Sequence, residues 1–328
     1  MKTLSFLIVL IFQIVIANGQ EIVLLYGSGS AGKSTLSREI CNLDPNWCHI
    51  DEDEVFNEIW LEHISKLFPN AYQFITEVLP HENLFQAIKN NTIIFPTNST
   101  YSQRESVKNA IEIIQSRITE NNLEEFRKMI FQHFEMLIIE QVREKINENK
   151  SIILDRWHTT PEMLYKAFPD TPVAKVLVFS TLEHTLENFN KRNERAVQTK
   201  NSSSHRLYKN FIPSYIHLYK LSSDPMRSLY CYQRSEIENI FKDIRDALLI
   251  EKSESKKAVL FNDITKERLD RLKEEFMPTK TGSDTLFLSP IDQYDCIINT
   301  QKKESFPQEE HHLLRHLTST LQHAYSFS

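Results

Sequence analysis

One ten-residue run limits the folds open to this chain more than any other stretch. The run is YGSGSAGKST at residues 26–35, and it holds three of the five glycines among 328 residues. It satisfies the pattern G-x-x-x-x-G-K-[ST] and stands between an apolar run at 21–26 and a helical run at 37–43. Glycines let backbone N–H groups turn toward an anion, and the following helix presents its positive end to that anion. The run predicts a phosphate-binding loop between a buried strand and a helix.

The loop residues divide into those that shape the backbone and those that carry chemistry. Lys33 is expected to reach the β- and γ-phosphates of a nucleotide, and Ser34 is expected to ligate Mg²⁺. The remaining nucleotide contacts are assigned to the backbone and side chains of Gly27, Ser28, Gly29, Ser30, Ala31, Gly32 and Thr35. The alternative reading, a glycine turn with an exposed lysine, fits poorly because the chain has so few glycines.

The composition indicates a soluble globular protein. Apolar residues make up 41% of the chain and charged residues 25%, which excludes a disordered or fibrous chain. The net charge of −6 argues against a broad basic face for nucleic acid, so no nucleic-acid partner is expected. The length suits one large domain or two small ones.

Short apolar runs alternate with helical stretches, which predicts an α/β protein with a parallel sheet. Five strand candidates are enough for a central sheet, and they lie at 21–26, 47–51, 151–155, 174–180 and 294–300. Between the second and third candidates the chain is mainly helical. Apolar residues at spacings of three and four predict an amphipathic helix at 122–146. These are Leu123, Phe126, Ile130, Phe134, Leu137 and Ile138, a stripe that is typical of a core-facing helix.

We therefore expect one domain over 20–328 with two insertions. The first, about 57–150, is a helical cap beside the active site or a purely structural lobe. The second insertion spans about 197–290, and its secondary structure is harder to predict from the sequence. It holds a polar loop at 199–206, a helix at 237–249 and a further strand candidate at 258–262, and the chain ends with a helix at 307–325.

The first nineteen residues resemble a signal peptide. Lys2 precedes an apolar run at 4–16, and the small residues Ala17 and Gly19 suit a cleavage site. The apolar run is short for a transmembrane helix, so we expect no stable membrane segment after cleavage and an exported protein, periplasmic or secreted. The alternatives are an uncleaved membrane anchor and a cytoplasmic protein with a misassigned start.

The four cysteines, Cys41, Cys48, Cys231 and Cys296, match no metal-binding spacing. A Cys41–Cys48 disulfide and buried free thiols both remain open.

Carboxylates follow two of the strand candidates. Asp51 and Asp53 come at the end of the second strand, which is the ligand side of an α/β sheet, and either could accept the proton of an attacking hydroxyl. Asp53 could instead cap the following helix. Asp155 ends the third strand and is expected to hold Mg²⁺. Arg156 is expected to contact substrate or to form a surface salt bridge.

After the fourth strand, a helical stretch at 180–196 carries Lys191, Arg192 and Arg195. Arg192 and Arg195 could close over the nucleotide and stabilise charge on the transferred phosphoryl group. A solvated helix end is the alternative reading, since cations are favourable there.

These residues resemble the chloramphenicol phosphotransferase-like kinases. The resemblance is carried by VLLYGSGSAGKSTL at 23–36 and LDPNWCHIDEDEVF at 43–56. In addition, YDCIINT at 294–300 and the FPQEE that follows at 306–310 resemble the last strand and the final helix of that family. It is weaker over 151–196 and 291–310. The resemblance implies a P-loop NTPase fold of the small-molecule kinase type, a three-layer sandwich that uses ATP and Mg²⁺. It also implies that Asp51 is the catalytic base.

The leading hypothesis is a Mg²⁺-ATP-dependent phosphotransferase acting on a hydroxyl group of a small molecule. The main alternative is an exported nucleotide-binding module whose kinase-like fold no longer catalyses, because free ATP is scarce outside the cytoplasm. A zeta-toxin-like kinase of a nucleotide sugar shares the hydrophobic-Asp-x-Asp element. A GTPase is disfavoured because the chain has no clear Asn-Lys-x-Asp motif. Nothing in the sequence indicates an oligomeric state.

Overall fold

The computed structural model describes residues 20–91, 93, 95–120, 123–156, 158–198, 208–226, 228–254, 266–277, 284–299 and 304–307. These residues divide into two compact units. The first unit holds the described residues within 1–56, 131–180 and 293–328, and the second holds those within 57–130 and 181–292. The expected insertions at 57–150 and 197–290 overlap the second unit, although its boundaries at 130 and 181 differ from theirs.

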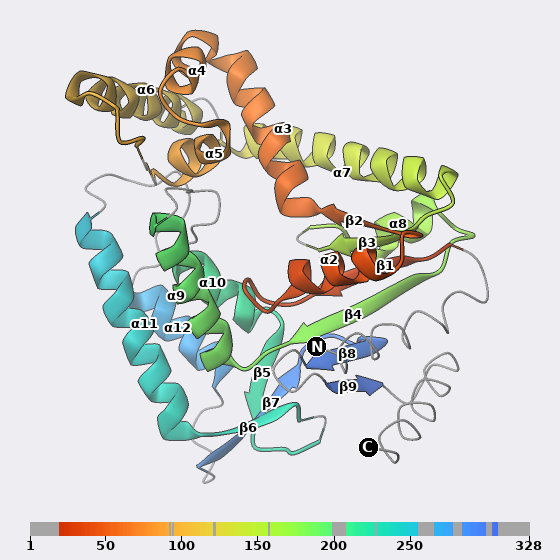
Figure 1. Cartoon of the computed structure of the whole chain (residues 1–328). Helices are drawn as coiled ribbons and strands as arrows, with labels where there is room; N and C mark the ends of the chain where they lie inside the picture. The colour runs from red at the N-terminus through yellow and green to blue at the C-terminus, as the bar shows by residue number, and fades with distance from the viewer. Residues whose placement is uncertain are drawn as a thin grey trace. The chain divides into compact units, whose positions relative to one another are not determined.

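A six-stranded sheet forms the centre of the first unit, in the order β2-β3-β1-β4-β8-β9 (Figure 1). Five neighbouring strands are parallel, and β9 pairs antiparallel with β8. The predicted α/β class with five parallel strands is confirmed. The strands are β1 (Ile22–Tyr26), β2 (Trp47–Asp51), β3 (Ser151–Asp155), β4 (Val173–Phe179), β8 (Cys296–Asn299) and β9 (Glu304–Pro307).

The strand order reverses direction at β1. From β1 the chain goes to β2 beyond β3, whereas from β3 it crosses to β4 on the other side of β1. In open α/β sheets, ligands bind at the carboxyl ends of the strands beside such a reversal. The carboxyl ends of β1 and β3 are therefore where a ligand site is expected.

Alternation along the strands places an apolar face against helix α2 (Lys33–Leu43). Leu36 and Ile40 of this helix pack in one core cluster with Leu25 of β1, Ile153 of β3 and Val178 of β4. Each of these side chains is less than one-tenth exposed. This packing fixes the start of α2 directly beyond the carboxyl end of β1.

Three further helices contribute to the first unit. They are the start of α3 (Glu52–Leu67), the later part of α7 (Leu123–Asn147) and α8 (Pro161–Ala167). Helix α8 has a capped start, because the Thr160 side chain accepts the Met163 N–H and Pro161 occupies the first turn. In α7, Phe126, Ile130, Phe134 and Ile138 are buried, so the aromatic stripe belongs to the core as expected.

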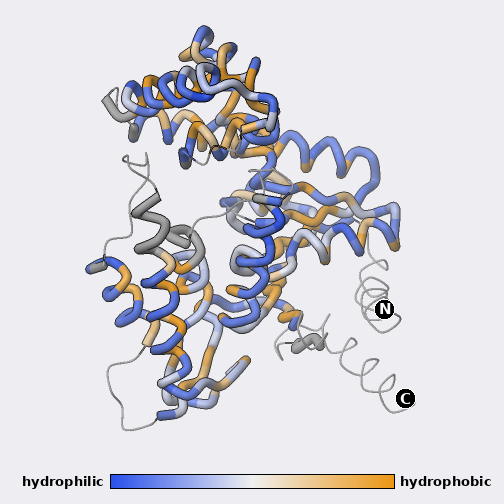
Figure 2. Tube along the Cα trace, turned by 60° about the vertical axis from the view of Figure 1, so that its left-hand side comes forward, coloured by the Kyte–Doolittle hydropathy of each residue, from blue (hydrophilic) through white to orange (hydrophobic). Residues whose placement is uncertain are grey.

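The second unit is mostly helical, and apolar and polar residues alternate along its helices (Figure 2). This is the pattern of helices that bury one face. The second unit contains the later part of α3 and the start of α7, together with α4 (Pro69–Thr76), α5 (His81–Asn90), α6 (Tyr101–Glu120), α9 (Leu182–Gln198), α10 (Tyr208–Ile216), α11 (Arg234–Glu254) and α12 (Lys266–Phe276). Helix α11 contains the helix predicted at 237–249, and α9 contains most of the stretch predicted at 180–196.

A three-stranded antiparallel sheet in the second unit was not predicted. Its order is β5-β7-β6, from β5 (Tyr219–Ser222), β7 (Thr285–Pro290) and β6 (Tyr230–Gln233). Two of these strands have only four residues, which is too short for a clear alternation. The sheet is joined to α9 through Tyr232, whose hydroxyl accepts the Leu182 N–H and donates to Glu183.

Several predicted segments lie outside the described residues. They are the leader at 1–19, the loop at 199–206, the strand candidate at 258–262 and nearly all of the last helix. That helix was expected to start near Pro307, but Pro307 pairs with Cys296 in β9. Within the described part, no helix is both long and apolar enough to span a membrane.

The four cysteines are free thiols, so the structure contains no Cys41–Cys48 disulfide. Burial raises the pKa of the Cys41 thiol to about 11, which keeps it protonated at neutral pH.

Candidate functional site

The loop between β1 and α2 has the backbone that its glycines predict. Gly27 and Gly32 have φ angles of 155° and 101°, and Ser30 is left-handed at 71°. The Ala31 N–H donates to the Ser28 carbonyl and closes the turn. A side chain at Gly27 would place its Cβ 2.8 Å from the Val178 carbonyl oxygen of β4. Glycine is therefore required at Gly27 by space as well as by conformation.

The start of α2 is suited to an anion. Its N-cap is Gly32, which makes no side-chain capping hydrogen bond, and its first turn carries no acidic residue. The first N–H groups of a helix have no partner within the helix and lie at its positive end. The first helical residue is Lys33, which adds a positive charge at the same place. Thr35 follows in this turn and is exposed.

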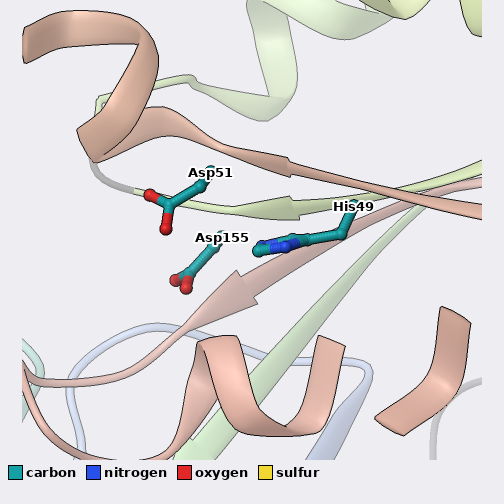
Figure 3. Close-up of side chains that lie close together, drawn as sticks. All are labelled: His49, Asp51 and Asp155. Atoms are coloured by element: carbon teal, nitrogen blue, oxygen red, sulfur yellow. The ribbon is translucent and has the colours of Figure 1, made fainter. Parts of the chain in front are cut away.

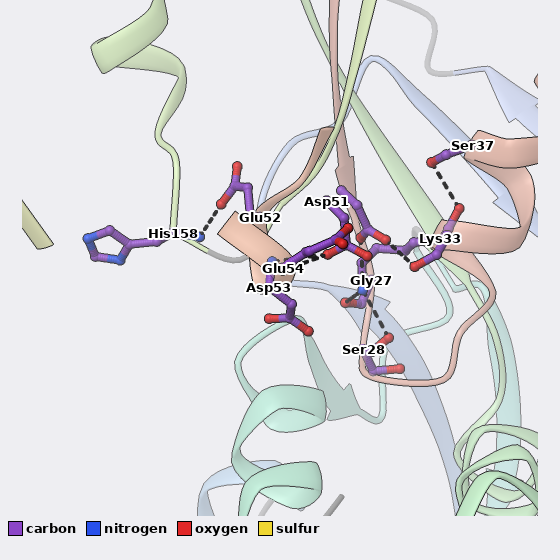
Figure 4. A network of polar contacts seen from close by, with 11 residues as sticks. Gly27, Ser28, Lys33, Ser37, Asp51, Glu52, Asp53, Glu54 and His158 are labelled. Atoms are coloured by element: carbon purple, nitrogen blue, oxygen red, sulfur yellow. Dashed lines mark hydrogen bonds and ion pairs between the residues drawn. The ribbon is translucent and has the colours of Figure 1, made fainter. Parts of the chain in front are cut away.

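Lys33 folds back over the loop that precedes it. Its Nζ donates to the Gly27 carbonyl at 3.0 Å and to the Ser28 carbonyl at 3.3 Å (Figure 4). The same Nζ lies 3.5 Å from Asp155 Oδ1. The side chains of Lys33 and Asp155 are only 14% and 7% exposed. Lys33 is thus held over the loop where the sequence places it, and the exposed-lysine alternative is wrong.

Asp155 joins the loop to the end of β3. Its Oδ2 accepts a short hydrogen bond from the Ser34 hydroxyl, while its Oδ1 faces Lys33. The pairing of β1 with β3 aligns Leu25 with Asp155, so the carboxylate emerges beside the first residues of the loop. The structure therefore brings together the two residues, Ser34 and Asp155, that the sequence assigns to a metal ion.

Asp51 stands next to Asp155 because β2 pairs with β3 in register, Asp51 opposite Asp155. The Oδ1 atom of Asp51 accepts the N–H groups of Asp53 at 3.0 Å and Glu54 at 3.4 Å. Asp51 therefore caps α3, and the alternative reading of Asp53 as the cap is wrong because α3 begins at Glu52. Asp53 is exposed in the first turn.

Burial raises the pKa of the Asp51 carboxyl above its usual value, and the negative charges of Asp155 and Asp53 raise it further. His49 and the hydrogen bond from Glu54 oppose this rise. A carboxylate with a raised pKa is a stronger base than an ordinary one.

His49 belongs to the same group of side chains, although no role was predicted for it. It lies two residues before Asp51 on β2, so both side chains project from the same face of the sheet. His49, Asp51 and Asp155 each offer a ligand atom, and these atoms lie within 4.8 Å of one another (Figure 3). The signal that could have identified His49 is the His-x-Asp spacing on a strand.

Glu52 is a second residue whose role the sequence did not reveal. It is fully buried, and its Oε2 accepts the N–H groups of His158 at 2.7 Å and Thr159 at 3.1 Å (Figure 4). The His158 ring in turn packs on Phe131 of α7, with centroids 4.4 Å apart. Glu52 thus ties the start of α3 to the loop that follows Asp155.

Arg156 forms no salt bridge among the described residues, and its expected contact with substrate stays a prediction. Its guanidinium lies 4.2 Å from the centre of the Tyr26 ring, and its Nε donates to the Thr159 carbonyl at 2.7 Å. This is a cation–π contact at the end of β1, supported by a backbone hydrogen bond. The ring of Tyr26 also packs edge-on against Tyr294.

Arg192 and Arg195 lie on α9 in the second unit, whereas the loop belongs to the first. Each unit is described by itself, so the structure does not bring these arginines to the loop or separate them from it. Arg192 is partly buried and Arg195 is exposed. Their expected position over a nucleotide stays a prediction.

The donors and acceptors at this edge of the sheet fit a magnesium-bound nucleotide. The uncapped start of α2 and the Lys33 ammonium suit phosphate, and the Ser34 hydroxyl and Asp155 carboxylate suit a hard cation. The Ser28 hydroxyl is also buried and has no hydrogen-bond partner among the described residues. Together the sheet and this edge define an α/β protein with a glycine-containing loop after β1 and carboxylates at the ends of β2 and β3.

Comparison with known proteins adds no relative to this description. No protein-family model matches the chain, and no curated protein matches it either. The likeness to the chloramphenicol phosphotransferase-like kinases therefore rests on the residues quoted above.

Proposed function

We propose that this protein is a Mg²⁺-ATP-dependent phosphotransferase that acts on a hydroxyl group of a small molecule. The observation that carries the proposal is the meeting of Lys33, Ser34 and Asp155 beyond the ends of β1 and β3. Asp51 lies on the neighbouring strand, opposite Asp155. This combination supplies a phosphate contact, two metal ligands and a base at one edge of the sheet.

The nucleotide would be held by the loop N–H groups and by Lys33, and Mg²⁺ by Ser34 and Asp155. Bound Mg²⁺ would neutralise charge on the β- and γ-phosphate oxygens. The acceptor oxygen then bonds to the γ-phosphorus as the bond from that phosphorus to the β–γ bridging oxygen breaks. ADP leaves with the bridging oxygen, and the hydroxyl proton passes to Asp51.

The remaining catalytic positions belong to the same proposal. Arg192 and Arg195 would stabilise the charge on the phosphoryl group during transfer, and Asp53 would stand close enough to Asp51 to assist it. The finer fold assignment, a P-loop kinase of the chloramphenicol phosphotransferase-like type, is supported by the loop after β1 and the carboxylate after β3.

Turnover and binding in three variants test these roles. ADP formation is measured on a library of hydroxyl compounds that includes nucleotide sugars, and ATP binding is measured in parallel by calorimetry. Lys33→Ala should abolish turnover and weaken ATP binding. Asp51→Asn should keep the helix cap, because asparagine caps as well as aspartate, and should keep ATP binding while losing at least about a hundredfold in turnover.

The matched control is Lys66→Ala, which removes an exposed lysine of α3. This variant should turn over ATP like the wild type. Unchanged turnover in Lys33→Ala would contradict the proposal.

A second candidate function is a nucleotide-binding module that does not catalyse. One observation favours it. The Oδ1 atom of Asp51 already accepts two N–H groups of α3, so this oxygen is less available to accept a proton from a substrate hydroxyl. It also suits the expected signal peptide. ATP binding with no ADP formation on any acceptor would favour this module.

A further inference from the structure

His49, Asp51 and Asp155 form a cluster of side chains. The proposed phosphoryl transfer uses the two aspartates but gives His49 no role. We refer to these three side chains as the His49 cluster. Two come from alternate positions of β2 and one from the paired position of β3, so all three project from the sheet face that α2 covers. Figure 3 shows the His49 imidazole extending toward the two aspartate side chains. Their ligand atoms lie within 4.8 Å of one another, a separation that a single cation can span.

The unsatisfied imidazole is a separate observation. The Nε2 atom of His49 is buried from solvent and has no hydrogen-bond partner among the described residues. Buried polar atoms in folded proteins nearly always have a partner, so an exception calls for an explanation. An ion between the ring and the carboxylates would explain both the exception and the approach of two acids on neighbouring strands.

We propose that His49, Asp51 and Asp155 bind a divalent transition-metal ion, of the class of Mn²⁺ and Zn²⁺. Imidazole is a common ligand of transition metals, whereas Mg²⁺ prefers oxygen ligands and keeps several of its waters. One nitrogen and two carboxylate ligands with room for water suit Mn²⁺ and Zn²⁺. Two carboxylates also balance the charge of the ion.

The proposed site differs from the magnesium position of the proposed function, although the two share Asp155. At the magnesium position the ligands would be the Ser34 hydroxyl and Asp155, without His49. At the transition-metal position the ligands would be His49, Asp51 and Asp155. An ion bound to Asp51 would occupy the carboxylate that we propose as the base. If the chain is a phosphotransferase, Mn²⁺ or Zn²⁺ in this site is therefore expected to inhibit it.

The test uses the full chain without nucleotide, so its result does not depend on the proposed function. Binding of Mn²⁺ is measured from the loss of the electron paramagnetic resonance signal of the free ion, and pulsed spectra detect nitrogen bound to it. The wild type should bind one Mn²⁺ with a coordinated imidazole nitrogen, and Zn²⁺ should displace it. His49→Gln should bind Mn²⁺ at least about tenfold more weakly and lose the nitrogen signal.

The matched control is His217→Gln, which removes an exposed histidine at the end of α10 and should leave both readouts unchanged. Circular dichroism shows whether each variant is folded. The nitrogen signal tests the proposal even if the carboxylates still bind the ion in His49→Gln, because it reports the imidazole alone. The proposal is overturned if the folded wild type binds no Mn²⁺, or if the bound ion has the same nitrogen signal in His49→Gln.

Discussion

Gly27 packs against the backbone of β4, with a conformation that L side chains rarely adopt. A Cβ there would lie 2.8 Å from the Val178 carbonyl oxygen and 3.3 Å from the Lys33 side chain. The lysine can move, but a carbonyl within a parallel sheet cannot. The space beside Gly27 therefore fixes the path of the loop relative to the sheet.

Gly27→Ala should lower the free energy of unfolding by about 1–3 kcal/mol, the usual cost of overpacking. Urea denaturation followed by circular dichroism measures this change. Gly29→Ala is the control, because a Cβ at Gly29 meets nothing within 4 Å. It should change the free energy of unfolding by less than about 0.5 kcal/mol. Equal losses in the two variants would show that the contact with Val178 is not what restricts Gly27.

At the residue scale, the position of a side chain was predicted correctly where its residue type has one main role in the motif that contains it. Lys33, Ser34 and Asp155 lie together as the loop pattern indicates. His49 and Glu52 were missed because histidine in a strand and glutamate in a first helical turn each have common structural uses. Asp155, which lies beside His49, and His158, which is bound by Glu52, come more than a hundred residues later, and the pairing of β2 with β3 brings them close.

Helix α3 and the loop after β3 are joined by one buried carboxylate. The Oε2 atom of Glu52 accepts two backbone N–H groups, those of His158 and Thr159. Loss of this carboxylate would remove the acceptor that both N–H groups use, and an unsatisfied buried donor costs about 1–3 kcal/mol. The loop after Asp155 thus depends on the first turn of α3 for its conformation.

Glu52→Ala should therefore lower the free energy of unfolding by about 2–4 kcal/mol. Two N–H groups lose their acceptor, and local relaxation recovers part of the cost of each. It should also speed hydrogen exchange at the amides of His158 and Thr159, measured by mass spectrometry or NMR. The control is Glu54→Ala, which removes an exposed side chain from the same turn. If exchange at these two amides is the same in both variants, Glu52 does not hold the loop.

The elements themselves were predicted unevenly. The strands at 47–51 and 151–155 were predicted to the residue, because each is a five-residue run with clear ends. The sheet of β5, β7 and β6 was missed because its pairing partners are far apart in sequence and two strands are very short. Strand β7 even ends in Pro290, a residue that argues against a strand in sequence alone.

At the scale of the whole molecule, the chain builds one unit around the parallel sheet and another mainly from helices. Within the first unit, Lys33 and Ser34 both contact Asp155, Asp155 lies opposite Asp51, and Asp51 accepts the Asp53 N–H. Residues of α3 and α7 belong to both units. Selection of the acceptor by the helices between β2 and β3 stays a prediction.

The central claim is that the γ-phosphate of ATP passes to a hydroxyl group. The most direct measurement is phosphorus NMR of the full chain with ATP, Mg²⁺ and pools of hydroxyl compounds. The account predicts a new phosphomonoester resonance that grows in a one-to-one ratio with ADP and is absent with Lys33→Ala. Inorganic phosphate as the sole product, or ATP that is bound but unchanged in every pool, would contradict it.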